Sequence, residues 1–225
     1  MTMNKNDMLL LYILYSVVME YNIITLGINC APALIARDLE LRKYSLPFDW
    51  IVTNNIQIMN CIEDDFKKFH KKIHFTLDNH WQMDEYGIQY PHEYPVNDDG
   101  TIVDNWQDYY EEVLIKYQRR IERFKNIMND SKPIIALYFG PLKYAEILKK
   151  YLEQKYNKII VFVVATNQKP VRNIDNMIIC NVYNNDQARD KAYWMNGINE
   201  AISRVKNVSN MNPTKRINKM FMKLF

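Results

Sequence analysis

Glycine is scarce in this chain: only five of its 225 residues are glycine, and no glycine-rich loop is present. The patterns GxGxxG and GxxxxGK[ST], whose glycines let the backbone wrap around a phosphate, are absent. The zinc-binding pattern HExxH and the nucleophile pattern GxSxG are absent as well. We therefore expect no cofactor and no bound metal.

Cysteine is also rare, with three residues at wide spacing: Cys30, Cys61 and Cys180. No CxxC pair is present, and an odd number of distant cysteines fits neither a disulfide framework nor a zinc site. This usage favours a reducing compartment, so we expect a cytoplasmic protein.

The net charge of the chain is small, and its apolar run near the start is short. The net charge of +3 is too mild for the concentrated basic face that nucleic acid requires, so no nucleic-acid partner is expected. The apolar run 8–19 is too short to cross a bilayer. Three interpretations of it stay open: a buried helix, a membrane-associated segment, or a leader that precedes a natural start at Met19. The basic, amphipathic tail 214–225 either makes a weak membrane contact or packs as a terminal helix.

The strongest structural signal is an alternation of apolar runs and amphipathic segments. Strands are predicted at 22–27, 133–139, 158–165 and 177–183, and helices at 31–40, 54–70, 106–128, 142–156 and 189–206. Continuous apolar strands separated by helices are typical of a parallel sheet covered on both faces. We predict an α/β fold with a mostly parallel sheet flanked by helices, in the three-layer manner of flavodoxin-like or SGNH-hydrolase-like proteins.

The segment 73–105 departs from this pattern and reads as an irregular aromatic insertion, with short strands possible near 86–90 and 101–103. The expected organisation has three parts. Residues 1–18 form the apolar leader or helix, residues 19–207 form one catalytic-type α/β domain, and residues 208–225 form the basic tail.

Cys30 is the residue best placed for chemistry. It follows a predicted strand and Gly27, and it precedes a helix with Pro32 in its first turn. Free N–H groups and the helix dipole at such a position stabilise a thiolate and can hold an oxyanion. Ligands bind at this corner in open parallel sheets. Cys61 and Cys180 fall on apolar faces and are expected to be structural.

A thiolate nucleophile usually works with a base, and His92 is the favoured candidate among four histidines. It is enclosed by two prolines and two tyrosines in the segment 90–95, which would hold the imidazole rigidly. His70 ends an amphipathic helix beside two lysines, so we expect it to be solvated. The spacing does not choose between Asp49, Glu93 and Asp104 as a third member.

Two arginines of the long helix, Arg119 and Arg123, share a face at i, i+4. They form either an anion clamp or a solvated surface paired with nearby acids. We expect Asn29, Ser45, Arg119 and Arg123 to contribute to substrate binding.

The run Leu26-Gly27-Ile28-Asn29-Cys30, followed by 41–51 (LRKYSLPFDWI), resembles the opening signature of a family described as putative papain-like cysteine peptidases. The segments 86–94 and 116–124 (KYQRRIERF) are similar to later blocks of that family. The resemblance implies that Cys30 is the nucleophile, His92 the base and Asp49 a supporting acid. The strand pattern disagrees with the family's description, because papain-like folds place a helical lobe before an antiparallel barrel.

Three functions remain open at this point. The favoured one is a thiol hydrolase or peptidase in which Cys30 attacks an acyl carbon and His92 moves the proton. The second is a transferase or hydrolase that modifies a glycan or an anionic substrate bound by the arginine helix. The third is a non-enzymatic binding module. The expected partner is thus a peptide, a small molecule or a glycan.

Overall fold

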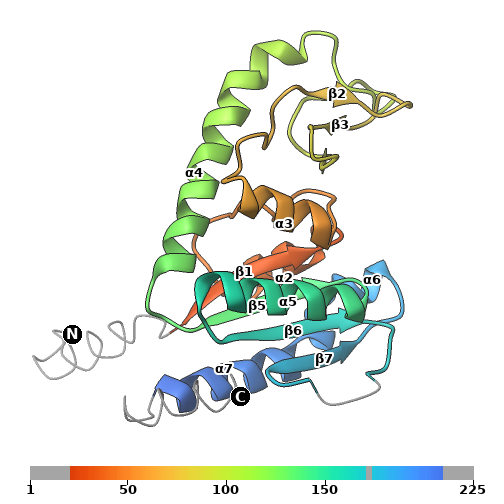
Figure 1. Cartoon of the computed structure of the whole chain (residues 1–225). Helices are drawn as coiled ribbons and strands as arrows, with labels where there is room; N and C mark the ends of the chain where they lie inside the picture. Colours follow the sequence, from red (N-terminus) through yellow and green to blue (C-terminus); the bar gives the residue numbers. More distant parts are fainter. Residues whose placement is uncertain (1–20, 171–173, 210–225) are drawn as a thin grey trace, which may run out of the picture.

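The computed structural model describes residues 21–170 and 174–209 (Figure 1). Its main sheet holds four parallel strands in the order β1-β5-β6-β7. They are β1 (Asn22–Gly27), β5 (Ile134–Phe139), β6 (Ile160–Thr166) and β7 (Met177–Asn181). The predicted leader 1–18 and most of the predicted tail 208–225 lie outside the described residues.

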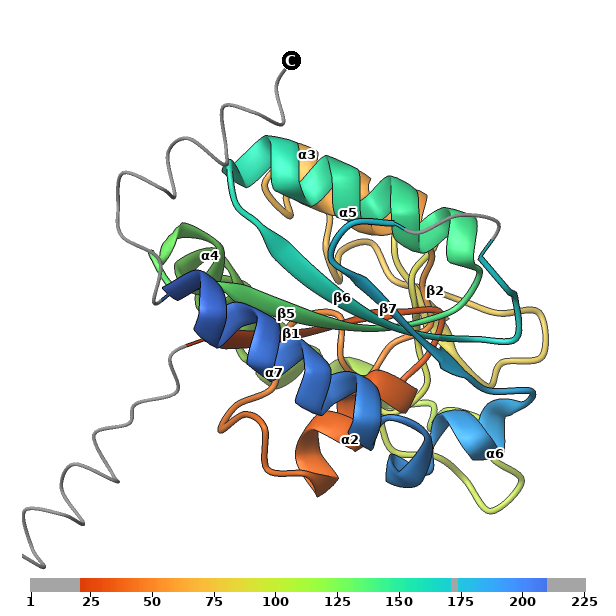
Figure 2. The same ribbon diagram turned by 90° about the horizontal axis from the view of Figure 1, so that it is seen from below.

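Helices cover both faces of this sheet, as Figure 2 shows. One face carries α2 (Ala31–Asp38) and α7 (Met195–Ser209), which pack on inward residues such as Ile23 and Val163. The other face carries α3 (Asn55–Glu63), α4 (Tyr110–Asn129) and α5 (Leu142–Tyr156), which pack on Ile24 and Phe162. Neighbouring residues of each strand thus enter different cores, because side chains alternate along a strand. The predicted three-layer α/β fold is confirmed.

The predicted helix 54–70 is wrong in its second half, because α3 ends at Glu63. Asp65 and Phe66 both take positive φ angles, of 61° and 62°, which end the helical path. The turn directs Phe66 and Phe69 into an aromatic cluster with Phe48. Tertiary burial of two phenylalanines therefore overrides the local helical periodicity.

The aromatic insertion folds around a small antiparallel sheet of β2 (His74–Phe75), β3 (Gln82–Met83) and β4 (Gln89–Tyr90). Figure 1 places this small sheet beyond α3, on the side away from the main sheet. A short 3-10 helix (Trp106–Tyr109) then leads into α4. No helix within the described residues is long and apolar enough to cross a membrane.

The helix predicted at 189–206 differs at its start: a 3-10 turn (Lys191–Tyr193) comes first, and α7 follows from Met195. A short helix, α6 (Asn185–Ala188), precedes the predicted range. The side chain of Asn184 accepts a hydrogen bond from Gln187 N, and that of Asp190 accepts one from Ala192 N. Each polar side chain starts a new turn, because its oxygen satisfies a free N–H.

Candidate functional site at the carboxyl edge of the main sheet

The corner between β1 and α2 is built around Gly27. This residue has a φ of 141°, which side chains rarely permit, and a Cβ atom placed on it would lie 2.4 Å from the carbonyl oxygen of Phe139. The next residue, Ile28, donates its N–H to the same oxygen at 3.0 Å. Glycine is therefore required here, because β1 and β5 approach too closely for any larger residue.

Cys30 caps the amino end of α2, as the sequence predicts. Its carbonyl accepts the N–H of Leu34, and Pro32 lies in the first turn of the helix. The residue is partly exposed, and within the described part of the chain no hydrogen bond engages its thiol. Cys30 is thus a partly exposed free cysteine beside the positive end of a helix.

Asn29 holds the corner in place. Its side-chain oxygen accepts a hydrogen bond from Ala31 N at 2.9 Å, and its Nδ2 lies 3.4 Å from Oδ1 of Asn185. The second contact links the β1–α2 corner to the β7–α6 corner. Asn29 therefore contributes to the shape of the site, and its predicted contact with substrate stays a prediction.

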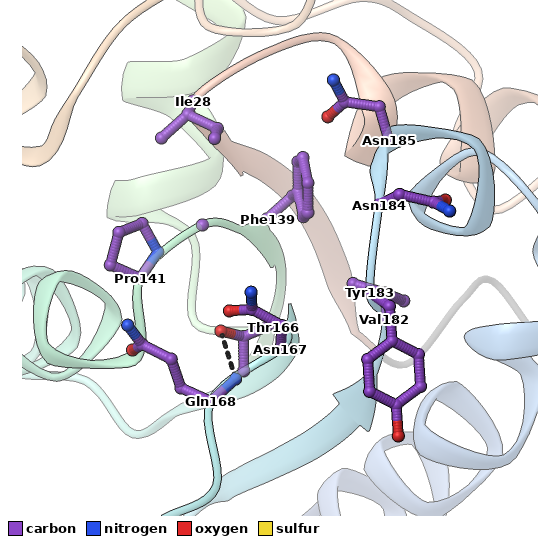
Figure 3. Close-up of a pocket in the computed structure, with 11 residues that line it drawn as sticks. Ile28, Phe139, Pro141, Thr166, Asn167, Gln168, Val182, Tyr183, Asn184 and Asn185 are labelled. Atoms are coloured by element: carbon purple, nitrogen blue, oxygen red, sulfur yellow. Dashed lines mark hydrogen bonds between the residues drawn. The ribbon is translucent and has the colours of Figure 1, made fainter.

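A cavity of about 390 Å³ lies beside this corner. Figure 3 shows that its walls come from the segments after β1, β5, β6 and β7, which are the carboxyl ends of all four strands. Its polar lining within the described residues consists of Thr166, Asn167, Gln168, Tyr183, Asn184 and Asn185, and none of the described lining residues is a lysine, arginine, aspartate, glutamate or histidine. The cavity thus offers neutral hydrogen-bonding groups in the crevice where open parallel sheets bind ligands.

The other two cysteines are structural, as the sequence predicts. Cys61 is fully buried on α3, and burial raises the pKa of its thiol far above the ordinary value. Burial also raises the pKa of Cys180, to about 11. Neither thiol forms a thiolate readily, so neither competes with Cys30 as a nucleophile.

Asp49 lies in the interior, away from any imidazole contact. Its carboxylate accepts hydrogen bonds from Thr25 Oγ1 and Leu46 N, and it pairs with Arg42 Nη1 at 2.5 Å. No hydrogen bond to a histidine is present among the described residues. In this structure Asp49 ties the 42–50 loop to β1, and its predicted role as a supporting acid stays a prediction.

His92 follows β4, and its side chain is exposed to solvent. No hydrogen bond joins its ring to Cys30 or to any other described residue. Its neighbour Glu93 turns inward instead, where it accepts a hydrogen bond from Tyr117 Oη and pairs with Lys116 and Arg120. The structure thus does not bring His92 and Cys30 together, and their pairing remains a hypothesis.

His70 differs from its expected solvated state. Its side chain is fully buried, and Nε2 lies 2.7 Å from the hydroxyl of Tyr94. Burial lowers the pKa of His70 to about 4. The prediction was wrong because the left-handed turns after α3 carry this residue inward, where Tyr94 and Tyr110 stack on its ring.

The two arginines of the predicted anion clamp lie in different environments. Arg123 is partly buried, stacks 4.7 Å over the ring of Tyr44 and points Nη1 toward the carbonyl of Ser45. It lines a second cavity, at the amino end of β1. Arg119 is exposed one turn earlier and does not line that cavity.

The hydroxyl of Ser45 accepts a hydrogen bond from Trp50 Nε1. Neither Ser45 nor either arginine lines the cavity beside Cys30.

Sequence reasoning missed the polar residues of the cavity on β6 and after β7. Thr166, Asn167 and Gln168 end one apolar strand, and Asn184 and Asn185 follow another. Polar residues directly after parallel strands are a usable signal, because these ends meet at one edge of the sheet. Among the described residues, no group of three or more histidine, cysteine, aspartate or glutamate side chains could hold a metal ion.

Together, the fold and this corner define an open-sheet α/β protein with an accessible thiol at the carboxyl edge. The comparison with protein families then matches residues 21–139 to the family described as putative papain-like cysteine peptidase, and the chain belongs to that family. The match begins at β1 and ends with β5, so it includes Cys30, Asp49 and His92. No curated protein and no solved structure matches the chain.

Proposed function

We propose that the protein is a thiol hydrolase in which Cys30 attacks an acyl carbon. The observation that carries this is the position of Cys30: it is partly exposed, it caps the amino end of α2, and it follows by two residues Ile28, which lines the 390 Å³ cavity although Cys30 itself does not. The helix terminus favours negative charge on the attacking sulfur. The family's description as a cysteine peptidase supports the same chemistry.

The reaction would proceed by acyl transfer. The thiolate of Cys30 forms a bond to the acyl carbon, and the carbonyl electrons move to oxygen to give an oxyanion. At the start of α2 the N–H of Ala31 already donates to Asn29 and Pro32 has none, so the backbone N–H groups of Cys30 and Ala33 are the donors that we propose for that charge. The proton lost by the Cys30 thiol passes through the general base to the leaving group when the intermediate collapses. Water then attacks the acyl carbon and gives a proton to the same base, and release of the acid returns that proton to the sulfur.

His92 as general base is the second part of this proposal and stands apart from the first. Its exposed ring would have to approach Cys30 when substrate binds, because the small sheet lies beyond α3 (Figure 1). Catalytic hydrogen bonds often form only in the substrate complex. His92→Gln therefore tests the base without disturbing a contact of the folded chain.

The neutral lining of the cavity bears on the substrate. The amide oxygens of Gln168, Asn184 and Asn185 already accept hydrogen bonds within the fold, and the NH2 groups of the same side chains suit uncharged acceptors such as peptide or sugar oxygens. Among the described lining residues, an anionic group would find no cation. We therefore favour an uncharged acyl substrate, a peptide above all, over the anionic substrate considered from the sequence.

The experiment uses p-nitrophenyl acetate as the acyl donor and peptide mass spectrometry to locate the adduct. We expect a burst of nitrophenolate and an acetyl group on Cys30. Cys30→Ala should abolish the burst, while Cys180→Ala, the matched loss of a buried thiol, should keep it. A burst that survives in Cys30→Ala, or acetylation elsewhere, would refute the assignment. If His92→Gln keeps full turnover, the base is a different group and the nucleophile still stands.

A further inference from the structure

A second cavity, of about 330 Å³, lies at the amino end of β1. It is enclosed by the start of β1, the segment 41–46 and the carboxyl-terminal half of α4. Cys30 follows the opposite end of the same six-residue strand, which spans about 17 Å at the usual rise per residue. This cavity is therefore distinct from the one beside Cys30.

Three cationic side chains line the second cavity: Arg42, Lys43 and Arg123. None of the described residues that line it is acidic. Arg42 is already committed, because its guanidinium pairs with buried Asp49 and donates to the carbonyl of Tyr44. Lys43 and Arg123 form no ion pair with any described residue. The cavity thus carries positive charge without compensation from its own walls.

Arg123 has the geometry of a recognition group. Its guanidinium lies 4.7 Å over the ring of Tyr44, and its Nη1 lies 3.5 Å from the carbonyl oxygen of Ser45, so two contacts favour one orientation of the planar group. Other donors of the fork stay available, and such a fork matches two oxygens of a carboxylate or phosphate. An arginine that served only as a solvated surface charge would not need this support, as exposed Arg119 illustrates.

The remaining walls describe the rest of the ligand. Ile23, Leu41 and Ile127 give an apolar surface next to the cationic group. A bare inorganic ion would leave that surface unused, whereas a compact apolar body would bury it. We propose that this cavity binds an organic oxyanion, a carboxylate or phosphate attached to a small apolar group, with Arg123 as the principal contact.

Calorimetric titration of the full chain tests this with four probes: hexanoate, hexyl phosphate, inorganic phosphate and 1-hexanol. We expect at least one of the two amphiphilic anions to bind, and to bind more tightly than inorganic phosphate or the alcohol. The stronger of hexanoate and hexyl phosphate identifies the anionic group. Arg123→Gln should weaken that binding at least about tenfold, because a charge-assisted contact is lost. Arg119→Gln is the matched control on the same helix and should change it less than about twofold.

Three results would overturn the inference. They are no binding of either amphiphilic anion, equal weakening by Arg119→Gln and Arg123→Gln, or tighter binding of 1-hexanol than of the anions. Urea unfolding checks that Arg123→Gln remains folded. If that variant unfolds, Lys43→Gln replaces it, because Lys43 is exposed and forms no ion pair with a described residue. Lys43→Gln should then weaken binding about two- to fivefold, and unchanged affinity would count against the site.

Discussion

Two regions of the molecule use polar residues in opposite ways. At the carboxyl edge of the main sheet, Cys30 lies two residues after Ile28, which lines a cavity whose described walls are uncharged. On the α4 side, charged groups form two sets of mostly buried ion pairs, which together we call the ion-pair network: Arg42 with Asp49, and Glu93 with Lys116 and Arg120. The network holds charge against opposite charge, whereas the cavity offers neutral side chains whose amide oxygens already accept hydrogen bonds within the fold.

This contrast separates residues that maintain the fold from residues available for chemistry. Asp49 belongs to the PFDW block of the family resemblance, and Lys116 and Arg120 belong to its KYxRRIxRF block. In the structure these residues join the 42–50 loop and α4 to the core. These signature residues are engaged in ion pairs within the fold, whereas Cys30 is both in the signature and partly exposed.

The largest expected effect comes from breaking the network. Asp49→Ala leaves Arg42 as a buried cation without its partner, which costs about 3–5 kcal/mol in the free energy of unfolding. Urea denaturation followed by circular dichroism measures this loss. The double variant Asp49→Leu, Arg42→Leu should lose much less, because no unpaired charge stays buried. A single variant as stable as the natural chain would show that the network does not maintain the fold.

His70 gives the next largest effect, as a dependence of stability on pH. The pKa of His70 is about 4 in the folded chain, against the ordinary value of 6.5 that applies in the unfolded chain. Between these two pH values the unfolded chain therefore binds more protons than the folded chain. Folding stability is therefore fully present above pH 6.5 and falls by about 3 kcal/mol as the pH drops toward 4.

Urea midpoints across this pH range test the effect of His70. The variant His70→Phe should flatten the loss, while His92→Gln, which changes an exposed histidine, should keep it. An identical slope for His70→Phe and the natural chain would assign the titration to other groups.

The corner beside Cys30 is more sensitive to shape than to charge. Gly27→Ala would place a methyl group 2.4 Å from a backbone oxygen at a strained φ, so we expect a loss of about 2 kcal/mol in unfolding free energy. Gly100→Ala is the control: its φ is also positive, but the nearest atom lies 3.4 Å away. Thermal unfolding should show the smaller loss for Gly100→Ala, and the reverse order would contradict the tight corner.

The smallest effect is expected at the cavity wall. Asn185→Ala removes only the long, exposed contact with Asn29, so the unfolding free energy should change by less than about 0.5 kcal/mol. Asn29→Ala also removes the bond to Ala31 N and should cost about 1 kcal/mol. Denaturant titration of both variants measures the difference, and a larger loss at Asn185 would mean that this wall helps to maintain the fold.

Much of the fold could be predicted because its signals are local. The strand 22–27 and the helix 142–156 match the structure closely, since apolar runs and helical periodicity report directly on burial. The end of α3 could not be predicted in this way. The turn after α3 is stabilised by the packing of Phe66 on Phe48 and Phe124, which are distant in sequence.

The residues of the candidate site could also be predicted only where the signal is local in sequence. The place of Cys30 at a strand-to-helix corner follows from Gly27 and Pro32, which are its neighbours in sequence. Whether Arg119 or Arg123 lines a cavity depends on the 41–46 segment, which packs against one turn of α4 and not the turn before it. Contacts of this kind have no local signal, and the same reason left the burial of His70 unpredicted.

The most direct test of the central claim is alkylation by iodoacetamide at pH 7.5, with peptide mapping and the nitrophenyl ester assay on the same samples. Cys30 should be modified at least about a hundredfold faster than Cys61 and Cys180, because burial raises the pKa of both of those thiols. Esterase activity should fall in step with the modification of Cys30. Activity that survives complete alkylation of Cys30, or equal labelling of the three cysteines, would contradict Cys30 as the nucleophile.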